Sequence, residues 1–169
     1  VDYDGFIDLI PTGAEEDDLP VFQYAQTDAT FRGLEAELAF VAWSQGSDTL
    51  TLELGYDTVR GETDLGPPAR IPPWSLSGRA ELEAGPWTLR GQVRHVGEQD
   101  RVADFELPTD AYTTADLFVG WTPNPAGGLT LFAEARNLTD EEVREHASFL
   151  KDLAPSPGRN LRVGASYRF

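Results

Sequence analysis

The chain has 169 residues, enough for one ordinary domain, and its 29 acidic and 13 basic residues give a formal charge of -16. This balance argues against nucleic acid as a partner, because phosphate binding needs a basic face. The absence of cysteine excludes disulfides, thiolate metal sites and cysteine nucleophiles, and His95 and His146 are the only histidines. No apolar run approaches the ~18 residues of a membrane-spanning helix.

Period-two alternation of apolar and polar residues dominates the chain and predicts an all-β fold. We expect about eight strands, each at or above the ~9 to 11 residues that a tilted strand needs to cross a bilayer. In chain order they lie near 1–11, 21–42, 49–60, 74–84, 87–98, 112–122, 128–138 and 159–169. The segment 139–153 is the only weak helical candidate. Because the chain lacks Met and its first residues already alternate like the middle of a strand, we expect a fragment or a trimmed chain.

The connections between these strands alternate in kind. Short connections rich in turn-forming residues lie at 44–48, 85–86 and 123–128. Long connections lie between them, at 12–19, 61–73, 98–111 and 139–158. An outer-membrane barrel has this asymmetry, with short turns at one end and long loops at the other.

The two faces of the strands differ sharply in polarity. One parity carries apolar residues and no charge within the strand windows, as in Leu161, Val163 and their equivalents. The other parity carries the charges, with Phe6, Phe118 and Phe132 as exceptions. This division predicts an antiparallel, up-and-down transmembrane β-barrel segment, because a charge on the lipid face is costly.

Aromatic residues support the lipid interpretation. They gather at the expected ends of the strands, as an interfacial girdle requires. Trp43, Trp87, Trp121 and Phe169 fall at the tight-turn end, and Trp74 falls at the other.

The stretch 132–169 resembles the C-terminal end of TonB-dependent outer-membrane receptors. It has a strand ending in Asn137-Leu138, then Asp140-Glu141, a long loop, Pro157-Gly158-Arg159 and a last strand ending in Phe169. The segment 24–38 is similar to a long strand of the same family. Within the family, the segment 145–159 looks most like a branch associated with zinc uptake.

This resemblance implies the C-terminal portion of a receptor barrel over residues 1–169, in the bacterial outer membrane, as an open or curled part of a larger barrel. The plug domain, the N-terminal strands and the TonB box would lie outside this chain. The resemblance also implies active transport of a scarce metal or metal chelate, with zinc first and a siderophore or haem next, energised through TonB.

The resemblance further implies several partners. They are outer-membrane lipid and lipopolysaccharide, the chain's own plug, the TonB complex and the barrel-assembly machinery, which would read Phe169 and Tyr167. We expect no cofactor. The chain offers no nucleophile paired with a base, so we do not expect an enzyme.

One loop offers a candidate metal site. Imidazole and carboxylate groups suit zinc, which accepts nitrogen and oxygen ligands. The predicted ligands are His146, Glu145, Asp152 and Glu142. A solvated loop histidine is the plainer alternative, and His95 suits an aromatic girdle better than a metal. The acidic run 15–18 could attract cations or bind calcium that bridges lipopolysaccharide phosphates, but a solvated loop is the favoured interpretation.

Two other folds fit the alternation. A self-contained small outer-membrane barrel, acting as an adhesin or structural protein, requires the first strand to pair with the last. A soluble ligand-binding β-barrel requires Leu50, Leu52, Leu161 and Val163 to point into a core.

Overall fold

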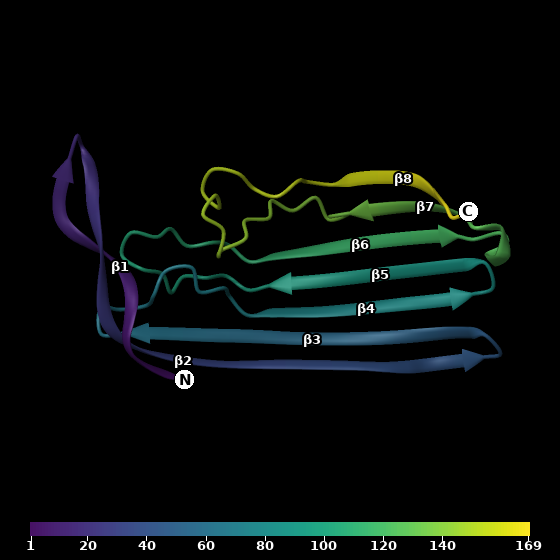
Figure 1. Ribbon diagram of the computed structural model, residues 1–169, viewed down its shortest axis with the longest axis horizontal. Helices are drawn as coiled ribbons and strands as arrows, with labels where there is room; N and C mark the ends of the chain where they lie inside the picture. The colour runs from purple at the N-terminus through teal and green to yellow at the C-terminus, as the bar shows by residue number, and fades with distance from the viewer.

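A computed structural model describes residues 1–169, apart from the side chain of Pro125. Eight strands form one antiparallel sheet in which each strand pairs with its neighbours in the chain (Figure 1). The strands are β1 (Asp2–Glu16), β2 (Leu19–Gln45), β3 (Asp48–Thr63), β4 (Ser75–Ala84), β5 (Trp87–Val96), β6 (Tyr112–Trp121), β7 (Leu129–Arg136) and β8 (Asn160–Tyr167). The predicted all-β, up-and-down fold is therefore confirmed.

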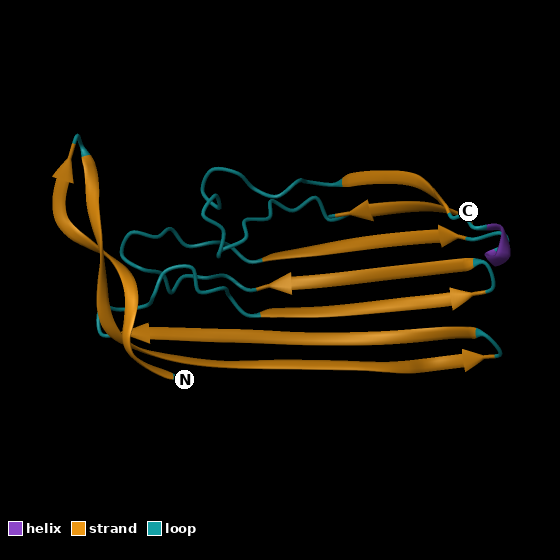
Figure 2. Cartoon of the chain, in the orientation of Figure 1, coloured by secondary structure: helices purple, strands orange, loops and turns teal.

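The connections follow the predicted alternation. Figure 2 shows the short connections at one end of the sheet and the long loops at the other. At the short end, Gly46 and Gly85 supply the left-handed backbone conformations of two tight turns. A short 3-10 helix, η1 (Pro125–Gly127), forms the third turn and is capped by the side chain of Asn124. The ends of the strands are thus set by local turn chemistry.

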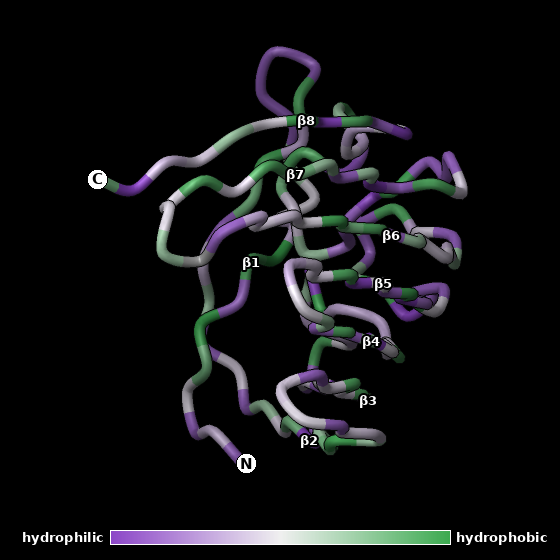
Figure 3. Tube along the Cα trace, turned by 90° about the vertical axis from the view of Figure 1, so that its right-hand side faces the viewer, coloured by the Kyte–Doolittle hydropathy of each residue, from purple (hydrophilic) through white to green (hydrophobic). Residues whose placement is uncertain are grey.

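The sheet is an open arc. Seen along its strands, it curves from β2 through β5 to β8 (Figure 3). Within the part of the chain that the structure describes, β1 pairs only with β2 and β8 only with β7. A closed eight-stranded barrel would need a pairing between β1 and β8, so the arrangement favours part of a larger barrel over a self-contained one.

The apolar face of the arc is its outer, convex face. Leu161 and Val163 are 77% and 81% exposed, where a soluble β-barrel would bury them. Few hydrophobic side chains are buried among the described residues, and they do not form a core between two layers: Ala29, Val96, Ala103, Tyr112 and Val143. Such a surface suits lipid, because in water it would be a large exposed apolar patch.

The β1–β2 hairpin differs from the sequence-based expectation. The segment 12–19 was expected to be a long loop, but β1 continues to Glu16 and β2 begins at Leu19. Asp17 and Asp18 alone form the turn, both with positive φ, as a two-residue hairpin turn of type I′ requires. The acidic run 15–18 is therefore the exposed tip of a hairpin.

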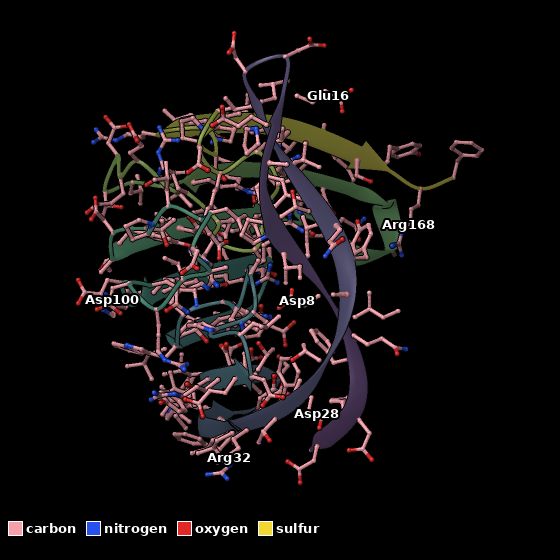
Figure 4. The ribbon with its side chains drawn as sticks, turned by 90° about the vertical axis from the view of Figure 1, so that its left-hand side faces the viewer. Asp8, Glu16, Asp28, Arg32, Asp100 and Arg168 are labelled. Atoms are coloured by element: carbon pink, nitrogen blue, oxygen red, sulfur yellow. The ribbon has the colours of Figure 1, made fainter. Side chains whose placement is uncertain are left out.

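The hairpin extends beyond the rest of the sheet and bends. Only the part of β2 from Ala29 onward pairs with β3. Irregularities in the β1–β2 register follow Tyr3 and Pro11, with left-handed glycines at Gly5 and Gly13. Such bulges bend and twist a strand. Figure 4 shows the hairpin rising from Asp28 past Asp8 to Glu16, along the open side of the arc.

The segment 139–153 forms turns where the sequence hinted at a helix. Its apolar residues follow no single face, so a helix would bury none of them consistently. Across the described residues, no helix has the length and apolar character needed to cross a membrane.

The two faces predict unequal responses to one substitution. Val93 and Gln92 are neighbours in β5 that point to the convex and concave faces. In the intact protein folded into lipid vesicles, Val93→Arg should lower the free energy of unfolding by about 1–3 kcal/mol, because a charge enters lipid between the midplane and the interface at His95. The matched Gln92→Arg should cost less than about 1 kcal/mol. Urea titration measures both, and equal losses would contradict the assignment of the faces.

Candidate functional site

A row of charged and aromatic side chains crosses the concave wall from β3 to β8. Its members, called here the concave ladder, are Glu53, Arg79, Glu81, Arg90, Phe118, Phe132, Arg162 and Glu134. Arg79 lies 3.3 Å from both Glu53 and Glu81, and Arg90 lies 2.5 Å from Glu81. Each half-exposed ion pair contributes only about 0–1 kcal/mol, so the main effect of these pairs is to neutralise charge along the wall.

Two stacked rings join the charged halves of the concave ladder. The centroids of Phe118 and Phe132 are 6.1 Å apart, with the planes nearly parallel. The Arg90 guanidinium lies 5.4 Å from the Phe118 ring, and that of Arg162 lies 5.6 Å from the Phe132 ring. These are cation-π distances. Arg162 also pairs with Glu134 at 2.5 Å, so the contacts run without a gap across six strands.

Glycines make room for both rings. A Cβ added to Gly164 would overlap the Phe132 ring, and one added to Gly120 would lie 3.1 Å from the Phe118 ring. Phe118 and Phe132 were exceptions to the polar parity. Their place above glycines explains how two large apolar rings fit on the charged face.

The base of the loop 137–159 is closed by two side chains. Buried Asn137 donates to the carbonyls of Glu141 and Pro157 at 2.9 and 3.4 Å, and its own carbonyl accepts from the Glu141 backbone N–H. The Asp140 carboxylate accepts from the backbone N–H of Arg159 at 2.9 Å. These bonds connect the two ends of a long segment that has no regular secondary structure.

A buried polar cluster joins this loop to the loop 97–111. We call it the loop cluster, and its members are Glu106, Thr109, His146 and Lys151. Lys151 Nζ lies 3.0 Å from the Glu106 carboxylate and donates to the Leu107 carbonyl at 2.6 Å. His146 Nδ1 shares a hydrogen bond with the Thr109 hydroxyl at 2.9 Å. The side chains of His146, Lys151 and Glu106 are only 1%, 5% and 6% exposed.

One contact in the loop cluster has an ion-pair distance but poor geometry. His146 Nε2 lies 3.3 Å from Glu106 Oε1, yet it makes no hydrogen bond to any of the described residues. The contact is therefore not an ion pair, and a buried neutral imidazole needs no countercharge.

The ionisation of the loop cluster follows from its contacts. Burial raises the pKa of Glu106. Hydrogen bonds from Lys151 and from the Arg70 backbone N–H lower it by a larger amount, so the net shift of the pKa is downward. Burial and the Lys151 ammonium lower the pKa of His146, against smaller opposing effects of Glu106 and Asp152. At neutral pH Glu106 is therefore ionised and the imidazole of His146 is neutral.

The structure does not gather the four predicted metal ligands, Glu142, Glu145, His146 and Asp152, around one point. Glu142 pairs with Arg144 at 2.7 Å, Glu145 accepts from the Tyr112 hydroxyl at 3.0 Å, and His146 faces the loop cluster. In the described part of the chain, no group of three His, Asp or Glu side chains is placed to hold a metal ion. A metal site in this loop stays a prediction.

The predicted girdle residues lie at the two ends of the strands. His95 packs against Trp74, with 5.1 Å between ring centroids, and bonds to the Thr113 hydroxyl at 2.8 Å. At the short-turn end, Trp87 and Trp121 stack at 5.9 Å. This arrangement matches aromatic rings at both membrane interfaces.

Sequence reasoning missed Glu106, Thr109 and Lys151. Glu106 and Lys151 are 45 residues apart, and no local pattern connects them. One signal was available: Lys151 is the only lysine of the chain, and it follows two apolar residues, Phe149 and Leu150. A single cation in such a setting could have been marked for burial against a carboxylate.

Comparison with known proteins shows which family has this architecture. Residues 1–138 match the family described as "TonB dependent receptor-like, beta-barrel". The chain belongs to this family. Its members are transporters of the bacterial outer membrane and not enzymes, so the convex face of this receptor segment meets outer-membrane lipid. A search of curated proteins gives no match.

Solved receptor structures share the fold. The chain aligns over 99% of its length with the copper transporter OprC at a TM-score of 0.78 and 19% identity, covering 27% of that chain. It aligns over 99% of its length with the FrpB iron transporter from Neisseria meningitidis at a TM-score of 0.71 and 14% identity, covering 26% of that chain. It aligns over 99% of its length with a mutant of the ferric enterobactin receptor PfeA from Pseudomonas aeruginosa, at a TM-score of 0.62 and 18% identity, covering 27% of that chain.

The chain therefore spans about a quarter of the length of these three receptors, which show a shared fold at low sequence identity. The ligands in their names describe those proteins alone.

The close approach of the Phe132 ring to Gly164 can be tested directly. Gly164→Ala should destabilise the intact receptor by about 1–3 kcal/mol, because the new methyl overlaps the Phe132 ring. Gly91→Ala is the matched control, since a Cβ there meets nothing within 4 Å. Chemical unfolding in detergent compares the two. A Gly164→Ala variant as stable as Gly91→Ala would show that the ring moves aside freely.

Proposed function

We propose that this chain is the C-terminal part of a receptor barrel that takes up a scarce metal or metal chelate across the outer membrane, energised through TonB. The match of residues 1–138 to the receptor family is the observation that carries the proposal. A lipid-facing convex wall and a charged concave wall support it, because a transport route needs a polar lining within an apolar exterior.

Zinc is the first ligand we propose, followed by a ferric siderophore or haem. The zinc assignment rests on the resemblance of the segment 145–159 to receptors associated with zinc uptake, and the set Glu142, Glu145, His146 and Asp152 belongs to the same proposal. The names of the structural neighbours mention copper, iron and ferric enterobactin, which supports the broader class of metals and chelates.

The partners of the proposed receptor follow from its two walls. The concave ladder offers alternating charges and two aromatic rings to a plug domain within the lumen. We infer that the plug and the segment that contacts TonB belong to other parts of the receptor. Lipid and lipopolysaccharide would cover the convex wall and its outer rim.

Deletion of the gene that encodes the intact receptor tests the transport proposal. Under starvation for each nutrient, we expect uptake of labelled zinc to fall and to depend on TonB, while uptake of an unrelated solute is unchanged. Loss of siderophore or haem uptake with normal zinc uptake would refute the zinc assignment. Normal uptake of zinc, copper, siderophore iron and haem would refute metal transport itself.

The end of β8 carries a second prediction. Phe169 and Tyr167 are fully or largely exposed at the carboxyl terminus, where assembly machinery could bind them. Deletion of Phe169 should lower the amount of receptor in the outer membrane several-fold, while the conservative Tyr167→Phe should leave it near normal. Quantitative blotting of membrane fractions measures both, and unchanged levels without Phe169 would exclude the assembly role.

A further inference from the structure

The hairpin and the loops meet at the outer end of the sheet. Phe22 in β2 packs edge-on against Phe105 in the loop 97–111, with 4.9 Å between ring centroids. Beside this contact lies a cavity of about 220 Å³, lined by Asp8 and Leu9 of the hairpin and by Leu65 and Phe105 of two loops. The hairpin thus contacts the loops through this aromatic pair.

Phe105 is fixed by its neighbour Glu106. A tight turn brings the backbone N–H of Glu106 to the carbonyl of buried Ala103 at 2.9 Å. The Glu106 carboxylate is then held by Lys151 Nζ and by the backbone N–H of Arg70, both near 3 Å. Because the two residues are adjacent in a turn, a movement of the backbone that carries the Glu106 carboxylate also moves the ring of Phe105.

Arg70 links a third loop to the same point. Its backbone N–H bonds to Glu106, and its guanidinium lies 3.4 Å from the centroid of the Phe149 ring in the loop 137–159. Arg144 donates to the backbone carbonyl of Lys151 and holds that residue from its own loop. The loops 64–74, 97–111 and 137–159 are therefore connected through a few shared residues.

A buried ion pair of this kind is costly to disrupt. With all partners present the charges are satisfied, whereas removal of one partner leaves the other buried and unpaired. A partly opened cluster is costly, so opening is expected to expose the whole cluster to water. His146 and Thr109 lie in the same cluster and must move with it.

We propose that the β1–β2 hairpin and these three loops form a single cover that opens as a unit. In this cover the Phe22–Phe105 contact connects the hairpin to the loops, and the Glu106–Lys151 ion pair holds the cover closed. Lys151 acts as a positioning residue, since it reaches the hairpin only through Glu106 and Phe105. Access to the concave wall from the outer end then changes in one cooperative step.

The amine of Lys151 allows a direct test in the intact receptor. Lys151 is the only lysine among these 169 residues, and peptide mass spectrometry follows its acylation by a water-soluble reagent in the peptide that contains it, separately from lysines elsewhere in the receptor. Acylation in the folded receptor should be much slower than in the denatured receptor. Phe22→Ala should raise the rate by about two- to tenfold, the fold-change expected from loss of an aromatic pair.

Tyr24→Ala is the matched control for this experiment. Tyr24 is an aromatic residue of the same hairpin, but it is 78% exposed. Its removal should leave the acylation rate of Lys151 unchanged. The proposal is overturned if Phe22→Ala has no effect, if Tyr24→Ala has an equal effect, or if Lys151 in the folded receptor reacts as fast as in the denatured one.

A second experiment tests whether a change in the loops affects the hairpin. It uses Lys151→Met, which keeps an apolar side chain and removes the ammonium. Amide hydrogens of residues 19–28 should then exchange faster by a similar factor. Arg159→Met is the control, because it removes only an exposed ion pair with Asp140 at 3.9 Å. Unchanged exchange in Lys151→Met would show that hairpin and loops move independently.

The Phe22→Ala measurement leaves every member of the loop cluster in place, so it decides the question even if Lys151→Met fails to fold. Neither measurement requires a transported ligand, and the result is therefore independent of the proposed uptake function.

Discussion

The alternation of two faces that meet different surroundings is the constraint on which the whole sheet depends. The side-chain period of a strand is two, so a slip of one residue moves every side chain to the opposite face. In β8 such a slip would turn Arg162 toward lipid and Val163 toward the charged wall. The partition therefore fixes the register of a sheet that has almost no buried apolar core.

Charge on the concave wall creates a second requirement, which the concave ladder meets. Arg90 and Arg162 each find a carboxylate, while the strands between them place Phe118 and Phe132 in the same row. Cation-π contacts allow the rings to continue the row without further charge. The aromatic exceptions on the polar parity are thus a consequence of the glycines opposite them and of the cations on either side.

Local signals determined most of the sheet and could be read from the sequence. Gly85-Pro86 and the alternation around it gave the bounds of β4 and β5 to within about two residues, the usual uncertainty of an element end. The hairpin could not be read so easily, because Asp17-Asp18 looks like part of an acidic loop. Asp17 and Asp18 both have positive φ, a conformation that costs energy for residues other than glycine and that the pairing of the flanking strands must offset.

The loop cluster shows a different limit of sequence reasoning. His146 lies close in the sequence to Glu142, Glu145 and Asp152, and this proximity suggested a metal site. In the fold its nearest polar partners include Thr109 and Glu106, which belong to another loop. Composition near a residue cannot reveal a contact that depends on how two distant loops meet, whereas strand alternation is local and survives without tertiary information.

The outer end of the sheet must be ordered by other means than its middle. There the chain leaves the bilayer, and long segments without regular structure carry a large conformational entropy cost. Asn137 closes the base of one loop, Val96, Tyr112 and Val143 pack beside it, and the loop cluster ties it to the next loop. Because these contacts are few and shared, loss of one weakens several segments together, and the hairpin that rests on Phe105 depends on the same small set.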